Sequence, residues 1–260
     1  MACKQDDLVD QFSKLSFNKE HESETDVDIP PNWLVMNPTK RGYSFRCPLP
    51  LNKLIAQNLS QTYFQRLLYI IEKENQIDDF HMRLGSSSHN GFNVDIQYKD
   101  VDTHSGPTTA DICISCDTNN ELSRASLIKT TSTTHIWLDA QLRNKFVLTP
   151  KRHIERLSEM TDEEMKQFWY DALVILNEVV CDYTSMIINH GKYRNHHHLH
   201  MKINIPQEQW NQKIEVKYEE KIKWMNDLFR SNSNILQQCF GDREFNQWSG
   251  IRNYQRQRKK

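Results

Sequence analysis

The side chains best suited to chemistry are concentrated in residues 195–206, NHHHLHMKINIP. A β-strand alternates the direction of its side chains, so a strand here would have two different faces. One face would be largely apolar and suited to the core, with His197, Leu199, Met201, Ile203 and Ile205. The opposite face would collect three imidazoles and an ammonium group, from His196, His198, His200 and Lys202. Because burying those four is costly unless they are paired or bound, the pattern predicts a phosphate or metal site; an exposed polar strand face is the alternative.

The elements that must position this run are predicted from periodicity and capping signals. Short strands are expected at residues 125–130, 135–139, 144–149 and 185–189, and a last strand at 196–205. Thr161 and Glu164 form a capping box, which starts a helix that we expect to reach about Tyr183. Its apolar face holds Met165, Phe168, Trp169, Ala172, Leu176, Val179 and Val180. This order of elements indicates an α+β domain, with one long helix packed on a mostly antiparallel sheet.

The flanking segments are interpreted as extensions of that domain, which spans residues 111–206. Residues 1–30 are polar and acidic, and we expect them to be disordered. Residues 31–110 form an N-terminal extension without an assigned role, in which the apolar spacing from Leu59 to Ile71 predicts an amphipathic helix. Residues 207–260 form a helical C-terminal extension, with one helix at about 216–229 and a basic tail, RNYQRQRKK.

Composition narrows the cellular setting. The chain has 33 basic and 34 acidic residues, so its bulk charge argues neither for nor against nucleic acid. No apolar run approaches the ~20 residues of a membrane helix, and no secretory signal is visible at the N-terminus. We therefore expect a cytoplasmic or nuclear protein with no membrane association, whose six cysteines are free thiols or metal ligands. The basic tail is a candidate contact for nucleic acid, although a solvated end has the same composition.

A family resemblance becomes specific at this point. The His-x-His-x-His run resembles the signature of the histidine-triad superfamily of nucleotide hydrolases and transferases. Residues 146–154, FVLTPKRHI, resemble the strand and Pro-Lys-x-His segment of that family, and residues 157–164 resemble its next turn and helix start. Asp139 stands where the family holds a ribose, and Cys113 and Cys116 resemble the Cys-x-x-Cys pair of some members. The resemblance covers residues 111–206 and implies a histidine-triad-like fold.

The resemblance implies that one histidine attacks a nucleotide α-phosphate to give a covalent nucleotidyl-histidine. His198 is the preferred nucleophile, because that register uses His196, His198 and His200 together. A triad of His198, His200 and Lys202 is the alternative, with His200 as the nucleophile. Asp139, Asn189, Asn195 and Lys202 are the candidate nucleotide-binding residues. The hydroxyl that often donates to the leaving group is missing from the turn before the triad, where Lys192, Arg194 or Asn195 could replace it.

A structural zinc site is a second implication. Cys113 and Cys116 supply two soft ligands, and His153 with His196 would complete a Cys₂His₂ set, as in the galactose-phosphate uridylyltransferases. The alternative is a pair of reduced structural thiols with His153 bonded locally. Such a zinc would be structural, since the catalytic work belongs to an imidazole, and no organic cofactor is expected.

The sequence thus predicts an enzyme, a nucleotide phosphohydrolase or nucleotidyltransferase, whose partner is a nucleotide or nucleotide conjugate. A module that binds nucleotide or nucleic acid, keeps the zinc and has lost turnover is the main alternative. A zinc-stabilised interaction domain without nucleotide is the third hypothesis. A homodimer is compatible with each of them.

Overall fold

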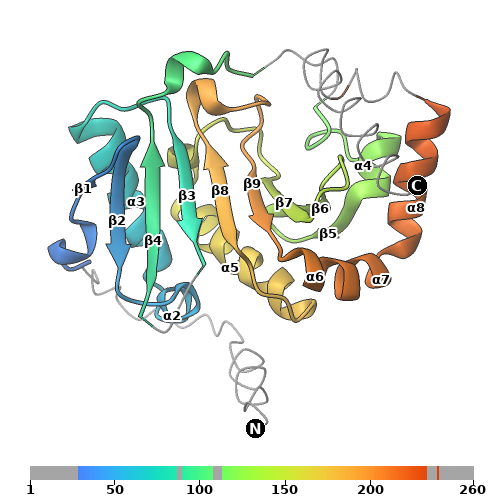
Figure 1. The fold of residues 1–260 in the computed structure, drawn as a ribbon, viewed down its shortest axis with the longest axis horizontal. Coiled ribbons are helices and arrows are strands. Elements are labelled where there is room, and N and C mark those ends of the chain that lie inside the picture. Colours follow the sequence, from blue (N-terminus) through green and yellow to red (C-terminus); the bar gives the residue numbers. More distant parts are fainter. Residues whose placement is uncertain (1–28, 87–89, 108–112, 233–238, 240–260) are drawn as a thin grey trace, which may run out of the picture.

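The protein was analysed as a computed structural model, which describes residues 29–86, 90–107, 113–232 and 239. Within these residues, nine strands form one sheet in the order β1-β2-β4-β3-β8-β9-β7-β6-β5, and every neighbouring pair is antiparallel (Figure 1). The strands are β1 Asn37–Pro38, β2 Gly42–Cys47, β3 His81–Gly85, β4 Phe92–Gln97, β5 Leu127–Thr130, β6 Thr134–Leu138, β7 Lys145–Pro150, β8 Ser185–Asn189 and β9 Met201–Asn204.

Helices cover one face of the sheet and its β5 end (Figure 1). Behind the sheet lie α2 Leu51–Ala56, α3 Ser60–Tyr69 with the π-turn Ile70–Glu74, and α5 Asp162–Glu178. At the β5 end lie α4 Glu121–Ser126 and α8 Glu219–Ser231, which follows α6 Gln207–Gln209, the π-turn Trp210–Ile214 and α7 Glu215–Lys217. Short 3-10 turns occur at Pro31–Leu34, Val101–Thr103, Leu157–Glu159 and Gly191–Tyr193.

The core lies between the sheet and the helices behind it. A row of paired residues crosses six strands with no exposed surface: Ile96, Met82, Ile188, Met201, Leu148 and Ile136. From the helices, Phe64 of α3 and Trp169 of α5 stack with ring centroids 3.7 Å apart. Because strand side chains alternate, this apolar row directs their sequence neighbours, among them Arg83 and Lys202, to the opposite face. That second face is where the polar groups of a site can gather.

The predicted α+β class is confirmed, and most of the predicted elements are present. Strands β6, β7 and β8 lie where they were expected, and α3 covers the expected amphipathic helix. Helix α5 begins with the predicted capping box, because Thr161 accepts from the backbone of Glu164 and the Glu164 side chain accepts from the backbone of Thr161. It ends at Glu178, before the predicted Tyr183, since Val180 takes a left-handed φ of 53° that stops a helix.

Three further boundaries differ from the prediction. Residues 125 and 126 end α4, so the first predicted strand begins only at Leu127. The C-terminal helix, expected at 216–229, is α8, Glu219–Ser231. The last predicted strand, 196–205, is confined to Met201–Asn204. Its N-terminal half leaves the sheet because Leu199 donates to the carbonyl of Ile154, which lies beyond the end of β7, at 2.7 Å.

The sheet also runs across the boundary predicted at residue 110. Strands β1 to β4 come from the predicted N-terminal extension, and β3 joins them to β8 through the register His81↔Asn189 to Gly85↔Ser185. The extension therefore shares one sheet and one core with residues 111–206. Disorder was predicted for residues 1–30, of which 1–28 lie outside the described residues, whereas Ile29 is described and is buried in the core. The basic tail after residue 240 and most of the segment 233–240 also lie outside the described residues. Within the described part of the chain, every helix is too short or too polar to cross a membrane.

The capping box of α5 gives a first prediction. Thr161→Ala removes the hydroxyl that satisfies an N-terminal amide of the helix, and we expect a loss of about 1 kcal/mol in unfolding free energy. Urea denaturation followed by circular dichroism measures this change. Thr62→Ala, inside α3, is the control and should leave stability unchanged or slightly higher, because alanine is the better helix former. Equal stability of wild type and Thr161→Ala would contradict the assigned role of the cap.

Candidate functional site

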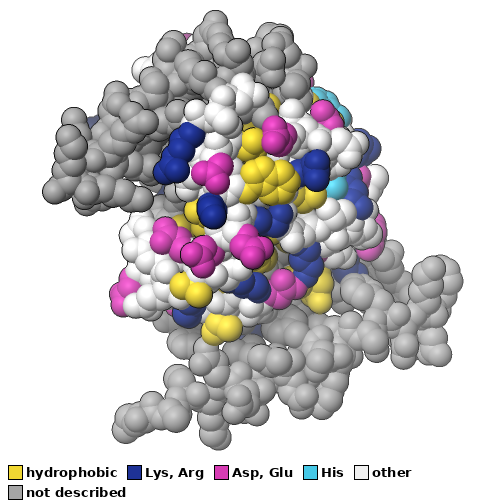
Figure 2. All heavy atoms as spheres, turned by 90° about the vertical axis from the view of Figure 1, so that its right-hand side faces the viewer, with side chains coloured by type: hydrophobic (Ala, Val, Ile, Leu, Met, Phe, Trp, Pro, Cys, Tyr) yellow, Lys and Arg dark blue, Asp and Glu magenta, His cyan; other side chains and the backbone are white. Residues whose placement is uncertain are grey.

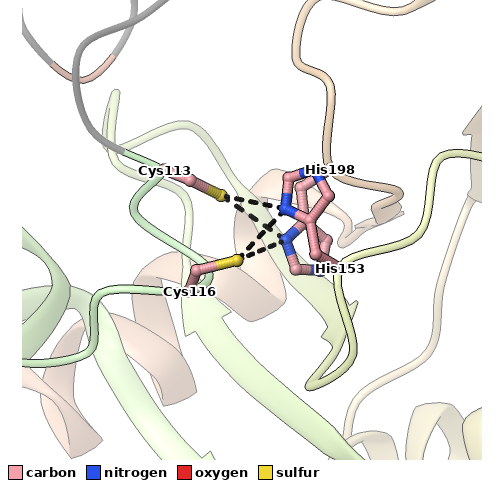
Figure 3. Close-up of side chains that lie close together, drawn as sticks. All are labelled: Cys113, Cys116, His153 and His198. Carbon is pink, nitrogen blue, oxygen red and sulfur yellow. Dashed lines mark hydrogen bonds between the residues drawn. The ribbon is translucent and has the colours of Figure 1, made fainter.

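Two thiols and two imidazoles converge at one point near the C-terminal end of β7 (Figure 3). Cys113 and Cys116 come from the turn before α4, His153 from the connection between β7 and α5, and His198 from the loop before β9. The four potential ligand atoms lie within 4.8 Å of one another. Cys116 Sγ is 3.1 Å from His153 Nδ1 and 3.4 Å from His198 Nδ1, and Cys113 Sγ is 3.9 Å and 3.5 Å from the same atoms.

These distances fit a tetrahedral metal. Zn–S bonds near 2.3 Å and Zn–N bonds near 2.0–2.1 Å give S···N edges of about 3.6 Å at the tetrahedral angle. The four measured edges, 3.1 to 3.9 Å, bracket that value. Thiolate and imidazole are the donors that zinc takes in structural sites. The residues present therefore fit a structural zinc in both chemistry and spacing.

The fourth donor is His198, whereas the sequence analysis placed His196 there. The backbone explains the difference, since residues 196–200 are not a strand and the alternation assumed for them does not hold. His198 also has a fixed orientation: Nε2 lies 2.8 Å from the carbonyl of Pro150, and Nδ1 faces the sulfurs. A backbone carbonyl that accepts from the second ring nitrogen is the usual support of a metal-bound histidine. Burial lowers the pKa of His198 to about 4, which keeps its ring neutral.

Local turns hold the two cysteines in place. The backbone amides of Cys116 and Asp117 both donate to the carbonyl of Cys113, at 3.0 and 2.9 Å, so the two thiols lie on one side of a tight turn. Ser123 of α4 donates to the carbonyl of Ile114 at 2.9 Å and ties this turn to the helix. Burial raises the pKa of the Cys116 thiol to about 12, with Cys113 adding to the effect. A bound metal would reverse this, because a coordinating thiol is deprotonated.

The loop that carries the histidines is clamped to the β7–α5 connection by Glu155. Arg194 donates to Glu155 Oε2 at 2.6 Å and His197 Nδ1 lies 3.2 Å from Oε1, while Arg194 also donates to the carbonyl of His197. Although burial alone raises the pKa of the Glu155 carboxyl, Arg194 and His197 hold that pKa below its ordinary value. Arg194 is thus a structural group of this loop, and it does not line the pocket described below.

His200 lies beside the cluster with a different environment. Its Nδ1 is 3.1 Å from the carbonyl of His198, and its ring centroid is 5.5 Å from that of His196. Burial holds the pKa of His200 well below its usual range, with Lys202 acting in the same direction. A neutral imidazole that donates from Nδ1 to a carbonyl keeps Nε2 without a proton. His200 is therefore set up as a nitrogen nucleophile or an acceptor.

One pocket joins these groups. Its wall includes Cys113, His153 and His198 of the cluster, the neighbouring His196, His197 and His200, and Asp139, Arg143 and Lys202. Asp139 follows the end of β6 and is 2 % exposed. Lys202 is on β9, opposite Val147 of β7, which also lines the pocket. The structure thus brings the histidines, Lys202 and Asp139 around a single cavity.

Two predicted nucleotide-binding residues lie elsewhere. Asn189, on β8, accepts through Oδ1 from His81 Nδ1 at 2.8 Å and donates through Nδ2 to the carbonyl of Tyr193 at 2.9 Å. Asn189 and Asn195 are both absent from the pocket wall, as is Lys192. Arg143 and Cys239 are among the pocket residues that the sequence analysis did not select. Arg143 lies four residues after Asp139, so their opposite charges were a signal of a possible pair. Cys239 has no spacing to another cysteine that would have revealed it.

Comparison with known proteins gives a likeness of fold. No protein-family profile matches the chain, and no curated protein matches it by sequence. A galt-like protein from Arabidopsis thaliana has a similar structure, with a TM-score of 0.50 and 13% identity over 70% of this chain and 77% of that one. An ADP-glucose phosphorylase from Arabidopsis thaliana gives 0.48 at 13% identity over 71% and 73%, and a uridylyltransferase gives 0.43 at 15% over 68% and 69%. The likeness to the galt-like protein confirms the predicted histidine-triad-like fold, and at 13% identity it concerns the fold alone.

The four-donor cluster gives a second prediction. Purified protein should contain about one zinc per chain, and both Cys113→Ser and His198→Asn should lose it and melt at a lower temperature. His196→Asn is the matched control and should keep the metal. Metal analysis by plasma mass spectrometry on protein never exposed to chelator makes the measurement. A zinc-free wild type would contradict the metal site, and loss of zinc in His196→Asn alone would restore the ligand set expected from the sequence.

Proposed function

We propose that the chain is a nucleotide phosphohydrolase or nucleotidyltransferase in which His200 attacks the α-phosphate of a bound nucleotide. The observation that carries this proposal is the hydrogen bond from His200 Nδ1 to the carbonyl of His198, inside the pocket that also holds Asp139 and Lys202. That bond fixes the tautomer in which Nε2 bears the lone pair.

The geometry favours His200 over His198, the nucleophile preferred from the sequence. Both ring nitrogens of His198 have partners, since Nε2 meets the carbonyl of Pro150 and Nδ1 meets the two sulfurs. An imidazole whose two nitrogens are both engaged has no lone pair left to attack the phosphorus atom. If the first histidine of the motif is the metal ligand, as the family resemblance implies, the triad is His198, His200 and Lys202. This is the alternative register of the sequence analysis.

The proposed reaction has two displacements. His200 Nε2 forms a bond to the α-phosphorus while the bond from phosphorus to the leaving-group oxygen or nitrogen breaks. Water or another acceptor then attacks the phosphorus, the P–N bond breaks, and its electron pair returns to Nε2. The nucleoside monophosphate, or its transfer product, is released. Covalent catalysis of this kind divides one difficult step into two easier ones.

Lys202 and His196 supply the remaining chemistry. Lys202 takes the place of the third histidine and brings a positive charge to the phosphate oxygens. A leaving group that is not already an anion needs a proton. Of the candidates considered from the sequence, Lys192, Arg194 and Asn195 do not line the pocket. His196 does line it, beside His200, and imidazole is the commonest proton donor in enzymes.

The zinc has a structural role in this proposal. Cys113, Cys116, His153 and His198 would hold it, and the ion would contribute binding free energy to the folded state. By fixing His198, it also fixes the carbonyl that orients His200. No chemical step passes through it.

A binding module with little or no turnover is the second candidate. It is favoured by the absence of the usual hydroxyl donor and by lysine in place of the third histidine.

Contact between the basic tail and nucleic acid stays a prediction, because the tail lies outside the described residues. A homodimer stays a prediction as well. Figure 2 shows the face over α8, where acidic and basic side chains are interspersed around a hydrophobic patch. This described face therefore lacks the single-sign surface that phosphate backbones favour.

The nucleophile assignment gives a third prediction. His200→Asn should abolish turnover and keep both the zinc and nucleotide binding, because asparagine can hydrogen-bond but cannot form the phosphoramidate. The assay uses nucleoside phosphoramidates, dinucleoside polyphosphates and adenylated nucleic acid, with released nucleoside monophosphate measured by chromatography. A loss of only about 10²–10⁴-fold would indicate a supporting acid or base role.

His198→Asn is the comparison that separates the two registers. Its activity should fall together with its zinc content and melting temperature. Full zinc content with no activity in this variant would return the nucleophile to His198. Wild-type protein that binds nucleotide in this pocket and turns over none of the substrates would favour the binding module.

A further inference from the structure

Asp139 is the pocket residue assigned to the ribose, yet donors of the protein already occupy its acceptor positions. Oδ1 accepts from the backbone amides of Gln141 and Arg143 at 2.9 and 3.4 Å, and from Arg143 Nε at 2.9 Å. Oδ2 accepts from Arg143 Nη2 at 2.7 Å. A carboxylate has about four lone-pair sites. A ribose diol, which needs both oxygens, would compete with the Arg143 guanidinium for the same lone pairs.

The two side chains differ in accessibility. Asp139 has 3 % of its side chain exposed and Arg143 has 36 %, and both line the same pocket. A carboxylate buried to this extent requires a partner at all times, because an uncompensated buried charge is costly. Arg143 is that partner in this structure. Its exposed position makes it the member of the pair that can move.

We propose that Arg143 is an exchangeable counter-ion of Asp139 and limits how strongly the pocket prefers ribonucleotides to ligands without the ribose diol. Ribose hydroxyls displace the guanidinium from Asp139, and Arg143 turns to a phosphate of the same ligand. The inference rests on the proposed function, since it takes a nucleotide as the occupant of the pocket. It deepens that function by assigning the substrate class as a molecule that carries both a ribose diol and a phosphate.

The surroundings allow this exchange. The two backbone amides on Oδ1 do not depend on the guanidinium, so Asp139 keeps part of its hydrogen bonding when Arg143 leaves. Arginine binds phosphate through a bidentate fork, so a phosphate can replace the carboxylate as its partner. Lys202 lines the pocket near this position, and Lys145 is close enough to Arg143 and Lys202 for their charges to act on it. Burial lowers the pKa of Lys145 to about 8, with both cations contributing. Arg143 and Lys202 thus bring two positive charges to the wall of the pocket that contains Asp139.

The exchange couples two parts of the ligand. A nucleoside without phosphate would break the ion pair and give Arg143 no new partner. A phosphate-bearing ligand without the diol would leave the ion pair closed. In the wild type, the hydroxyls therefore contribute less to affinity than Asp139 alone would provide. The loss of the buried Arg143 pair offsets part of their contribution, and a phosphate contact made by the more exposed guanidinium returns less than that pair provides.

The test measures affinity by calorimetry for the four ribonucleoside 5′-monophosphates and their 2′,3′-dideoxy analogues. We define the diol preference as the dissociation constant of the dideoxy analogue divided by that of the matching ribonucleotide. Arg143→Ala should raise this preference about tenfold, which corresponds to about 1.4 kcal/mol, because the hydroxyls no longer compete. Arg143→Lys, which keeps the charge and loses the fork, should give an intermediate value and covers the case in which the alanine variant does not fold.

Two further variants serve as controls. Arg152→Ala removes a matched bidentate pair, Arg152 with Glu164 at 3.0 and 2.7 Å, outside the pocket wall, and should leave the preference unchanged. Asp139→Asn should abolish the preference with or without Arg143. A preference that is unchanged or lower in both Arg143 variants overturns the inference while the proposed function stands. Wild-type protein that binds neither series overturns both.

Discussion

The convergence of two thiols and two imidazoles is the constraint on which the site depends. Its members are separated by as many as 85 residues, from Cys113 to His198, and come from three connections at one end of the sheet. A tetrahedral ion bound there would hold all three connections in one geometry. The cluster places His198 among the potential ligands and leaves His200 to face the pocket. The carbonyl of His198 then orients the ring of His200, so the metal geometry reaches the proposed nucleophile through one residue.

The sheet makes this arrangement possible by separating two environments. The buried row from Ile96 to Ile136 places apolar groups against α3 and α5, and the pleat sends Lys202 and Val147 to the face that carries the pocket. Strands β1 to β4 extend the same sheet beyond β8 and give the helices a wider surface to cover. They do not line the pocket. Their contribution is therefore to the core that supports β8 and β9.

The sequence was informative wherever a local rule dominates. The capping box of α5, the amphipathic period of α3 and the apolar strands at β7 and β8 all follow from spacing, and the structure has them. Prediction failed where a tertiary contact overrides the local pattern. Residues 196–200 alternate like a strand, but the bond from Leu199 to Ile154 and the Glu155 clamp draw them into a loop. That loop moves His198 into the metal position, which no reading of alternation could provide.

The pairing of Asp139 with Arg143 illustrates a more general limit of motif transfer. A motif identifies the group that contacts the ligand, but it does not identify the group that satisfies it before the ligand arrives. For a side chain as buried as Asp139, the bonds to the protein and the bonds to the ligand contribute similar free energies, since the carboxylate must be compensated with either partner. Affinity is then the difference between two sets of hydrogen bonds. If Arg143 exchanges as proposed, the residue that pairs with Asp139 within the protein affects specificity as much as the residue that binds the ligand.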